Sequence, residues 1–168
     1  MNIHFKLTTR MEARLRNDLE RSHPHASERV GFVSARFGWA DHGLLIVAND
    51  YYSVADSDYE IDGAVGARIN GTAFRGALQM ALSANVGMFH VHLHEHNGLP
   101  RPSAVDWTEW ERFVPNFWHV RPDLPHGALI LSADRIAGWC WYPGRARPAT
   151  ISMFSQIGSR LHSCREVL

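Results

Sequence analysis

Hydrophobic and polar positions alternate along this chain with two different periods, one typical of strands and the other of helices. Two-residue alternation and short apolar runs predict strands, whereas apolar residues three or four positions apart predict helices. The strand pattern covers residues 2–7, 28–37, 43–50, 86–94, 127–133 and 136–143, and a further strand or the start of a helix covers 149–154.

Helical periodicity predicts three helices, over about 10–21, 72–84 and 103–113. Thr9 and Glu12 have the spacing of a capping box at the start of the first helix. Phe74, Leu78 and Leu82 fall on one face of the second helix, which is therefore expected to pack through that face.

The order of these elements predicts one α/β domain built on a mixed β-sheet. Strands and helices are interleaved, but the pair 28–37 and 43–50 and the pair 127–133 and 136–143 are each joined by a short turn, as in antiparallel hairpins. With 168 residues the chain is long enough for one core, so a single domain over 1–168 is expected. The polar, acidic residues 51–66 are expected to form a long surface loop.

Charge and composition exclude several classes of function. The 17 basic and 17 acidic residues cancel and no long basic run occurs, so neither nucleic acid nor a membrane is expected as a partner. The first residues lack the apolar core of a signal peptide, and no apolar stretch approaches the roughly 18 residues that cross a bilayer. Cys140 and Cys164 are too few for a disulfide framework and suit core thiols, so a cytoplasmic protein is expected.

The most informative stretch is FHVHLHEHNGLPRPSAVDW, residues 89–107. Side chains on a strand alternate between its faces, so His90, His92 and His94 point the same way. Asp106, early in the helix that starts at Ser103, brings a carboxylate toward the same point. Two imidazoles and one carboxylate with a position left open make a catalytic Zn²⁺ site, and Fe²⁺ or Mn²⁺ suits the same ligands.

Each part of this pattern also has a purely structural explanation. Ser103 and Asp106 have the spacing of a helix capping box, and a histidine-rich strand end is sometimes only solvated. The combination of H-x-H, a loop and S-x-x-D nevertheless favours a metal site over either explanation alone.

At these residues the sequence resembles the JAMM (JAB/MPN-plus) metallopeptidases, whose signature is an upstream Glu, then H-x-H, seven residues and S-x-x-D. The segment ERVGFV resembles the family's E-x-x-G strand, and it follows a first helix and a proline, Pro24. The order of elements also resembles the family's MPN/JAB fold, a mixed sheet between helices related to the cytidine deaminases. The resemblance covers about residues 1–140.

The spacing departs from the signature by one residue. Eight residues separate His94 from Ser103, whereas ten separate His92 from Ser103, so the spacing favours His92 and His94 as the ligand pair. The pair His90 and His92 remains open, because GMFHVH resembles the apolar run before H-x-H in many relatives. The unused histidine would then be a neighbouring side chain. Glu95 stands where the family commonly has a proline.

The resemblance implies a role for each residue. His92, His94 and Asp106 would bind Zn²⁺, and Glu28 would be the general base for the water that attacks an amide carbonyl. Ser103 would donate a hydrogen bond to the developing oxyanion. If Glu28 is not the base, Glu12 and Glu20 on the first helix are the nearby substitutes.

The resemblance also implies a substrate class and partners. JAMM enzymes cut after the C-terminal Gly-Gly of ubiquitin or ubiquitin-like proteins, and a compact chain looks like the bacterial members that work beside E1- and E2-like enzymes. The tail of the modifier is expected to pair with an exposed sheet edge, with residues 51–66 as one wall of the groove. Lys6 is the only lysine beside sixteen arginines, which is consistent with such a setting.

Two other functions stay open, and a third is excluded. A peptidase acting on a sulfur-carrier protein would use the same residues, and a non-catalytic MPN-type scaffold would bind partners without cutting. A nucleoside deaminase needs H-x-E and P-C-x-x-C, and the sequence contains neither string.

Overall fold

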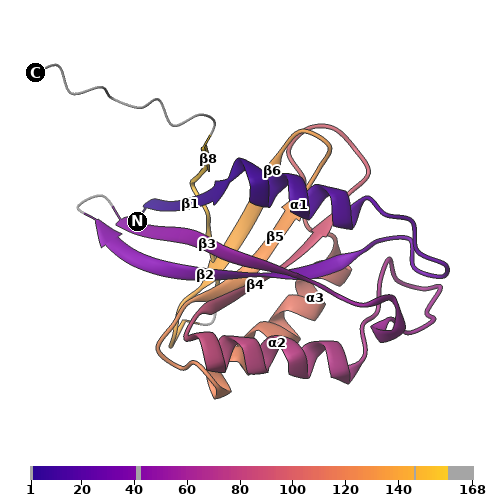
Figure 1. The fold of residues 1–168 in the computed structure, drawn as a ribbon. Coiled ribbons are helices and arrows are strands. Elements are labelled where there is room, and N and C mark those ends of the chain that lie inside the picture. The colour runs from indigo at the N-terminus through magenta and orange to yellow at the C-terminus, as the bar shows by residue number, and fades with distance from the viewer. Residues whose placement is uncertain (1, 41–42, 146, 159–168) are drawn as a thin grey trace, which may run out of the picture.

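The computed structural model describes residues 2–40, 43–145 and 147–158. One sheet of eight strands contains every strand of the described chain, and helices lie on both of its faces (Figure 1). In chain order the elements are β1 (Asn2–Thr8), α1 (Thr9–Leu19), β2 (Val30–Ala40), β3 (Gly43–Ser53), the 3₁₀ helix η1 (Asp56–Asp58), α2 (Gly71–Ala84), β4 (Gly87–Leu93), α3 (Ala104–Phe113), the 3₁₀ helix η2 (Val114–His119), β5 (His126–Leu131), β6 (Ile136–Trp141), β7 (Ala149–Thr150) and β8 (Met153–Ile157).

The sheet is mixed, as the sequence predicted. Its strand order is β7-β6-β5-β4-β2-β3-β1-β8. The pairs β1–β3, β1–β8 and β4–β5 are parallel, and the remaining pairs are antiparallel. Both expected hairpins are present, as β2–β3 and β5–β6, although the turn at 41–42 lies outside the described residues. The fold class is therefore α/β with a mixed sheet.

The alternation of side chains along β4 divides the interior into two sides. Phe89, Val91 and Leu93 pack in the core beneath α1. Met88 points the other way, into the core that α2 covers, and α3 covers a third group of buried side chains on that face. The even-numbered residues of β4 therefore face α2 and α3, which places His90 and His92 on that side of the sheet (Figure 1).

Two local predictions about the helices are wrong. Thr9 does not cap α1: the cap is Thr8, whose hydroxyl accepts the N–H of Met11, and Glu12 instead pairs with Arg16. Leu82 is 55% exposed and does not belong to the packed face of α2.

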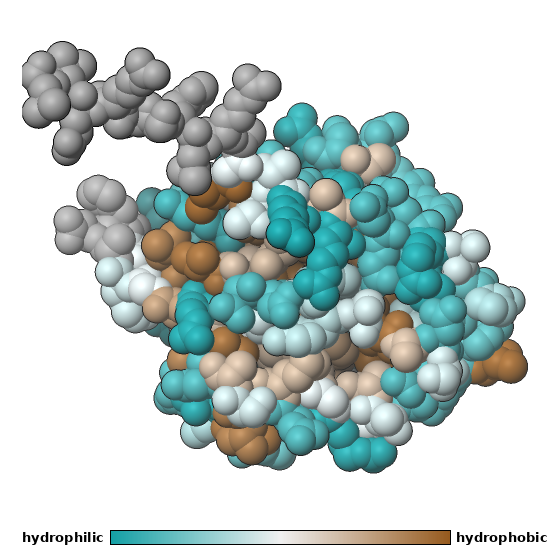
Figure 2. Space-filling view, viewed as in Figure 1, coloured by the Kyte–Doolittle hydropathy of each residue, from teal (hydrophilic) through white to brown (hydrophobic). Residues whose placement is uncertain are grey.

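The buried residues of α2 are Ala77 and Ala81, because the small side chains let the helix lie close to β2 and β4. The surface over α2 accordingly mixes hydrophobic and hydrophilic side chains, whereas that over α1 is largely hydrophilic (Figure 2).

The stretch 51–66 is more ordered than a plain loop. β3 continues to Ser53, η1 follows, and Tyr59 forms an isolated bridge with Ile69. Cys140 is a buried free thiol, as expected, while Cys164 lies outside the described residues. Within the described part of the chain, no helix is both long and apolar enough to cross a membrane.

Gly31 on β2 is the glycine of the E-x-x-G pattern that begins at Glu28, and its role is in packing. The ring of Tyr51 on β3 lies where a Cβ of residue 31 would be, and the Tyr51 hydroxyl donates to Asp18 of α1 at 2.5 Å. Tyr51 is fully buried, so its ring has no room to move aside. Burial and the bond to Asp18 raise the pKa of Tyr51 well above its usual range, which keeps the hydroxyl a donor.

We expect Gly31→Ala to lower the free energy of unfolding by about 1–3 kcal/mol, since it overpacks Tyr51. Gly76→Ala is the matched control, because a Cβ on this residue of α2 meets nothing within 4 Å and alanine favours a helix. It should raise stability by about 0.5–1 kcal/mol. Urea unfolding measures the free energy of unfolding of both variants. An equal change in the two variants would contradict the packing role of Gly31.

Candidate metal centre

Two histidines at the end of β4 bring their ring nitrogens together. The Nε2 atoms of His92 and His94 lie 3.0 Å apart. His94 follows the last residue of the strand, and its N–H donates to the carbonyl of Leu131 on β5, which keeps the backbone extended there. The two rings therefore stay on the face that α3 covers, as strand alternation predicted.

Asp106 meets these rings from the first turn of α3. Its Oδ1 lies 3.2 Å from His92 Nε2 and its Oδ2 lies 3.7 Å from His94 Nε2. The helix begins with a capping box in which Ser103 Oγ accepts the N–H of Asp106 and Asp106 Oδ2 accepts the N–H of Ser103. The capping box therefore also directs the carboxylate of Asp106 toward the two imidazoles.

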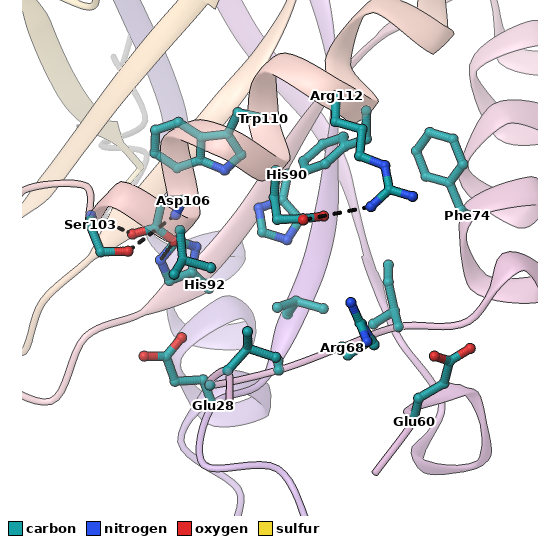
Figure 3. A pocket seen from close by; sticks show the side chains of 18 of the residues that line it. Glu28, Glu60, Arg68, Phe74, His90, His92, Ser103, Asp106, Trp110 and Arg112 are labelled. Atoms are coloured by element: carbon teal, nitrogen blue, oxygen red, sulfur yellow. Dashed lines mark hydrogen bonds and ion pairs between the residues drawn. The ribbon is translucent and has the colours of Figure 1, made fainter. Parts of the chain in front are cut away.

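Glu28 approaches from the opposite wall. One oxygen of its carboxylate and one nitrogen each of His92 and His94 all lie within 4.8 Å of one another. Val30 pairs with His92 across β2 and β4, so Glu28, two residues earlier, falls next to His94. Figure 3 shows the carboxylate of Glu28 directed toward His92 and Asp106 across a cavity.

Residues 59–70 hold Glu28 in this position. The N–H of Glu28 and the hydroxyl of Ser27 both donate to the carbonyl of Gly66, at 3.0 and 3.2 Å. A Cβ on Gly66 would lie only 2.6 Å from the carboxyl carbon of Glu28. Only a glycine at position 66 therefore leaves the carboxylate where it is.

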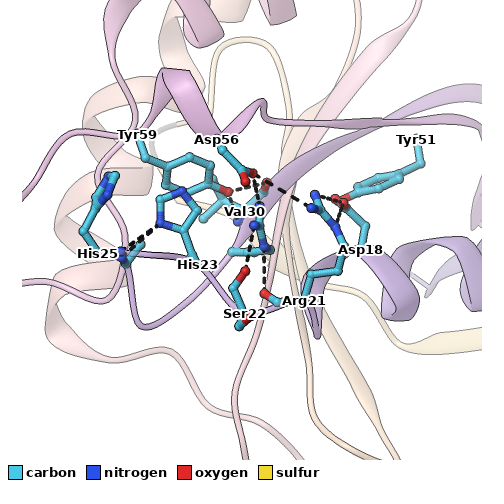
Figure 4. A network of polar contacts seen from close by, with 11 residues as sticks. Asp18, Arg21, Ser22, His23, His25, Val30, Tyr51, Asp56 and Tyr59 are labelled. Atoms are coloured by element: carbon cyan, nitrogen blue, oxygen red, sulfur yellow. Dashed lines mark hydrogen bonds and ion pairs between the residues drawn. The ribbon is translucent and has the colours of Figure 1, made fainter.

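A buried network fixes the backbone around Glu28 (Figure 4). The guanidinium of Arg29, only 2% exposed, donates to the carbonyls of Arg21 and Ser22 and to the carboxylate of Asp56 at 2.7–2.9 Å. The hydroxyl of Tyr59 accepts the N–H of Val30 and donates to its carbonyl. These bonds tie the start of β2 to the end of α1 and to η1.

The electrostatics suit a cation between these groups. Burial lowers the pKa of His92 to about 4 and lowers that of His94, although Asp106 raises both in part, so the two imidazoles are neutral at pH 7. Neutral imidazole and ionised carboxylate are the forms that bind metal. Nδ1 of His92 is buried with no hydrogen-bond partner among the described residues, so a neutral ring that offers Nε2 to a metal would carry its proton on an Nδ1 without an acceptor there.

Glu28 itself differs from an ordinary surface carboxylate. Burial, followed by the charges of Asp106 and Glu95, raises its pKa to about 7. A carboxyl with a pKa near 7 accepts and returns protons readily at physiological pH.

The chemistry of the donors fits zinc. Two imidazoles and one carboxylate leave a position open for water or substrate, which is the composition of catalytic zinc sites. Within the described residues, the one group whose ligand atoms all lie within 4.8 Å of one another is Glu28, His92 and His94. Asp106 is not a member of that group, but its two oxygens lie 3.2 and 3.7 Å from the same two imidazole nitrogens. The structure therefore supports a metal-binding group here.

The structure brings together four of the five predicted side chains, Glu28, His92, His94 and Asp106, with Ser103 at the rim of the same cavity. The rival pair is disfavoured, because the His90 ring lies one step deeper, 5.5 Å from the His92 ring and against Phe113. Burial lowers the pKa of His90 well below its usual value.

Glu12 is not available as a base, since it lies on α1 and bonds to Arg16 and Gln156. Sequence reasoning missed the part played by Gly66, and a glycine in a loop gives no signal of such a contact.

The cavity has a volume of about 670 Å³ and continues well past the metal ligands. Residues 64–71 form one wall and α3 the other (Figure 3). Of the expected wall at residues 51–66, only Glu60 and residues 64–66 line this cavity. The exposed sheet edge that was expected to pair with the tail of the modifier does not lie at this cavity, because β4 is paired on both sides, with β2 and β5.

Comparison with known proteins adds no family to these observations. The sequence matches no protein-family model, and a search of curated proteins found no match.

We expect purified protein to bind about one zinc per chain through His92, His94 and Asp106. Alanine at any of these positions should reduce zinc to background, whereas His90→Ala should retain it, since the His90 ring lies outside the converging group. Elemental analysis after zinc loading measures this directly. Loss of zinc in His90→Ala with retention in His94→Ala would move the site two residues toward the start of β4.

Proposed function

We propose that this chain is a zinc-dependent peptidase or isopeptidase of the JAMM type, with an MPN/JAB fold, that cuts after the C-terminus of a ubiquitin-like protein. The observation that carries the proposal is the approach of Glu28 to His92 and His94, with Asp106 in contact with both rings. These residues occur in the family's order and come from three separate parts of the chain: Glu28 shortly before β2, His92 and His94 at the end of β4, and Asp106 in α3. The mixed sheet with helices on both faces is compatible with that fold.

A bound zinc ion would polarise the amide carbonyl and lower the pKa of a water molecule. Glu28, whose carboxylate lies close to both histidines, is placed to take a proton from that water and hand it to the leaving amine. Its backbone is held by Gly66 and by the Arg29 network, so the carboxylate stays directed at the histidines.

Ser103 supplies a hydroxyl at the rim of the cavity. Its oxygen already accepts the N–H of Asp106, so its proton is free to point toward the substrate. We assign it the donor that stabilises the developing oxyanion.

The cavity determines how a substrate tail would lie. A tail cannot add as a strand beside β4, so it would run between residues 64–71 and α3, with its amide at the metal end. A tail ending in Gly-Gly is narrow enough to place its backbone close to buried imidazoles. A ubiquitin-like protein or its conjugates would be the partner, with E1- and E2-like enzymes in the same pathway. A sulfur-carrier peptidase would use the same residues.

Glu28→Gln tests the role of the base. We expect the variant to keep its zinc and to cleave its substrate about 10²–10⁴-fold more slowly, because glutamine is similar in size but accepts no proton. Cleavage of ubiquitin linked through Gly-Gly to a lysine side chain, and of a Gly-Gly peptide extended by further residues, measures the rate. Loss of zinc in Glu28→Gln would make Glu28 a ligand instead.

Gly66→Ala tests the same role without changing the carboxylate itself. The added methyl group would displace the Glu28 side chain, so the rate should fall at least ten-fold while the zinc content stays at the wild-type value. Gly63→Ala, in the same loop and with nothing within 4 Å of its Cβ, is the control and should be unaffected. Equal rates for the two variants would show that Glu28 is not held by this contact.

A further inference from the structure

Beyond the metal ligands the cavity opens into an aromatic recess, formed by the side chains of Phe32, Phe74, His90 and Phe113. The rings follow one another from the metal end of the cavity to Phe74. The His92 ring lies 5.5 Å from His90, His90 lies 5.0 Å from Phe113, and Phe113 lies 6.0 Å from Phe74. The recess is therefore continuous with the catalytic end and is not a separate site.

The opposite wall of the recess is also apolar. Val65, Ala67 and Ile69 of the loop line it, and all three are half-buried. They line the same cavity as Phe74 and Phe113, which are likewise half-buried. An apolar group placed between these walls would contact aromatic rings on one side and aliphatic side chains on the other.

Charge at the outer end of the cavity does not select an ion of either sign. Glu60, Arg68, Glu109 and Arg112 line it, two of each charge, and Figure 3 places Arg68, Glu60 and Arg112 at the end away from Glu28. Arg68 already pairs with Asp62, and Arg112 lies 3.8 Å from Glu109. The feature of the recess that discriminates between occupants is therefore its apolar lining.

We propose that the aromatic recess binds a bulky apolar side chain of the residue that follows the scissile amide. This inference rests on the proposed function, since it takes the scissile bond to lie at His92 and His94. A Gly-Gly tail has no side chain to offer, so the occupant belongs to the leaving part of the substrate. The preferred substrate class is then a precursor extended by an apolar residue rather than a lysine-linked conjugate.

The reason for this preference is desolvation. A phenylalanine or leucine side chain fills the recess with apolar atoms alone, and its burial is favourable. A lysine-linked conjugate would carry peptide groups beyond its four-carbon stem, and peptide groups buried without hydrogen bonds are costly. Of the four side chains that form the recess, only His90 can form hydrogen bonds, and the further polar side chains Asn70, Arg112 and Asn116 belong to the rest of the cavity lining.

Peptide binding tests the inference without requiring turnover. Acetyl-Gly-Gly-(4-fluorophenylalanine)-amide is titrated with zinc-loaded Glu28→Gln protein and followed by ¹⁹F NMR, and acetyl-Gly-Gly-Gly-amide is the competitor. We expect the aromatic peptide to bind at least ten-fold more tightly than the glycine peptide. Phe74→Ala should remove most of that difference, whereas Leu82→Ala, an exposed residue on the same helix, should leave it unchanged.

Ala67→Leu is a second variant that narrows the recess from the loop side, in case Phe74→Ala does not fold. It too should weaken binding of the aromatic peptide about ten-fold with zinc retained. Equal affinity of the two peptides, or no effect of either recess variant, overturns the inference.

Cleavage by the wild type separates this inference from the proposed function. Cleavage of the glycine and phenylalanine peptides at equal rates overturns the inference and leaves the proposed function intact. Preferential binding of the aromatic peptide without cleavage of either supports the recess and overturns the proposed function.

Discussion

The antiparallel register of β2 against β4 is the constraint on which the rest of the site depends. Val30 pairs with His92, and this pairing places Glu28 beside His94 on the face that α3 covers. A shift of one residue would turn the histidines into the core beneath α1, where Phe89 and Val91 now lie. The hydrophobic residues on the odd-numbered positions of β4 therefore hold the register, and the register positions the polar residues.

Four separate features then bring the side chains of the site together. The capping box of α3 directs the carboxylate of Asp106 toward the histidines. The hydrogen bond from the N–H of His94 to the carbonyl of Leu131 continues the strand geometry of β4 by one residue, which keeps His94 beside His92. On the other wall, Arg29 and Tyr59 fix the backbone at the start of β2, and Gly66 leaves room for the carboxylate of Glu28. Because residues 64–71 line the cavity and include Gly66, which contacts Glu28, a change in this loop is expected to alter both the position of Glu28 and what the cavity can bind.

Strand alternation alone was enough to place His90, His92 and His94 on one face, and the S-x-x-D spacing was enough to place Asp106 at a helix start. The mixed sheet followed from two hairpins with short turns. The spacing to Ser103 favoured His92 and His94, but the sequence left the pair His90 and His92 open, because the choice depends on where α3 crosses the sheet. It also gave no sign of Gly66 or of the recess, since both arise from contacts between residues far apart in the chain. The prediction of an N-cap at Thr9 was wrong for a local reason. Thr8 has the same side chain, lies one residue earlier where β1 ends, and caps the helix instead.

The most direct test of the metal centre is the ligand sphere of the zinc-loaded protein, measured by X-ray absorption at the zinc edge together with anomalous diffraction from crystals. The account predicts two imidazole nitrogens and at least one carboxylate oxygen around the ion, with the anomalous peak between His92, His94 and Asp106. Three imidazoles including His90, or an ion bound away from Asp106, would contradict it.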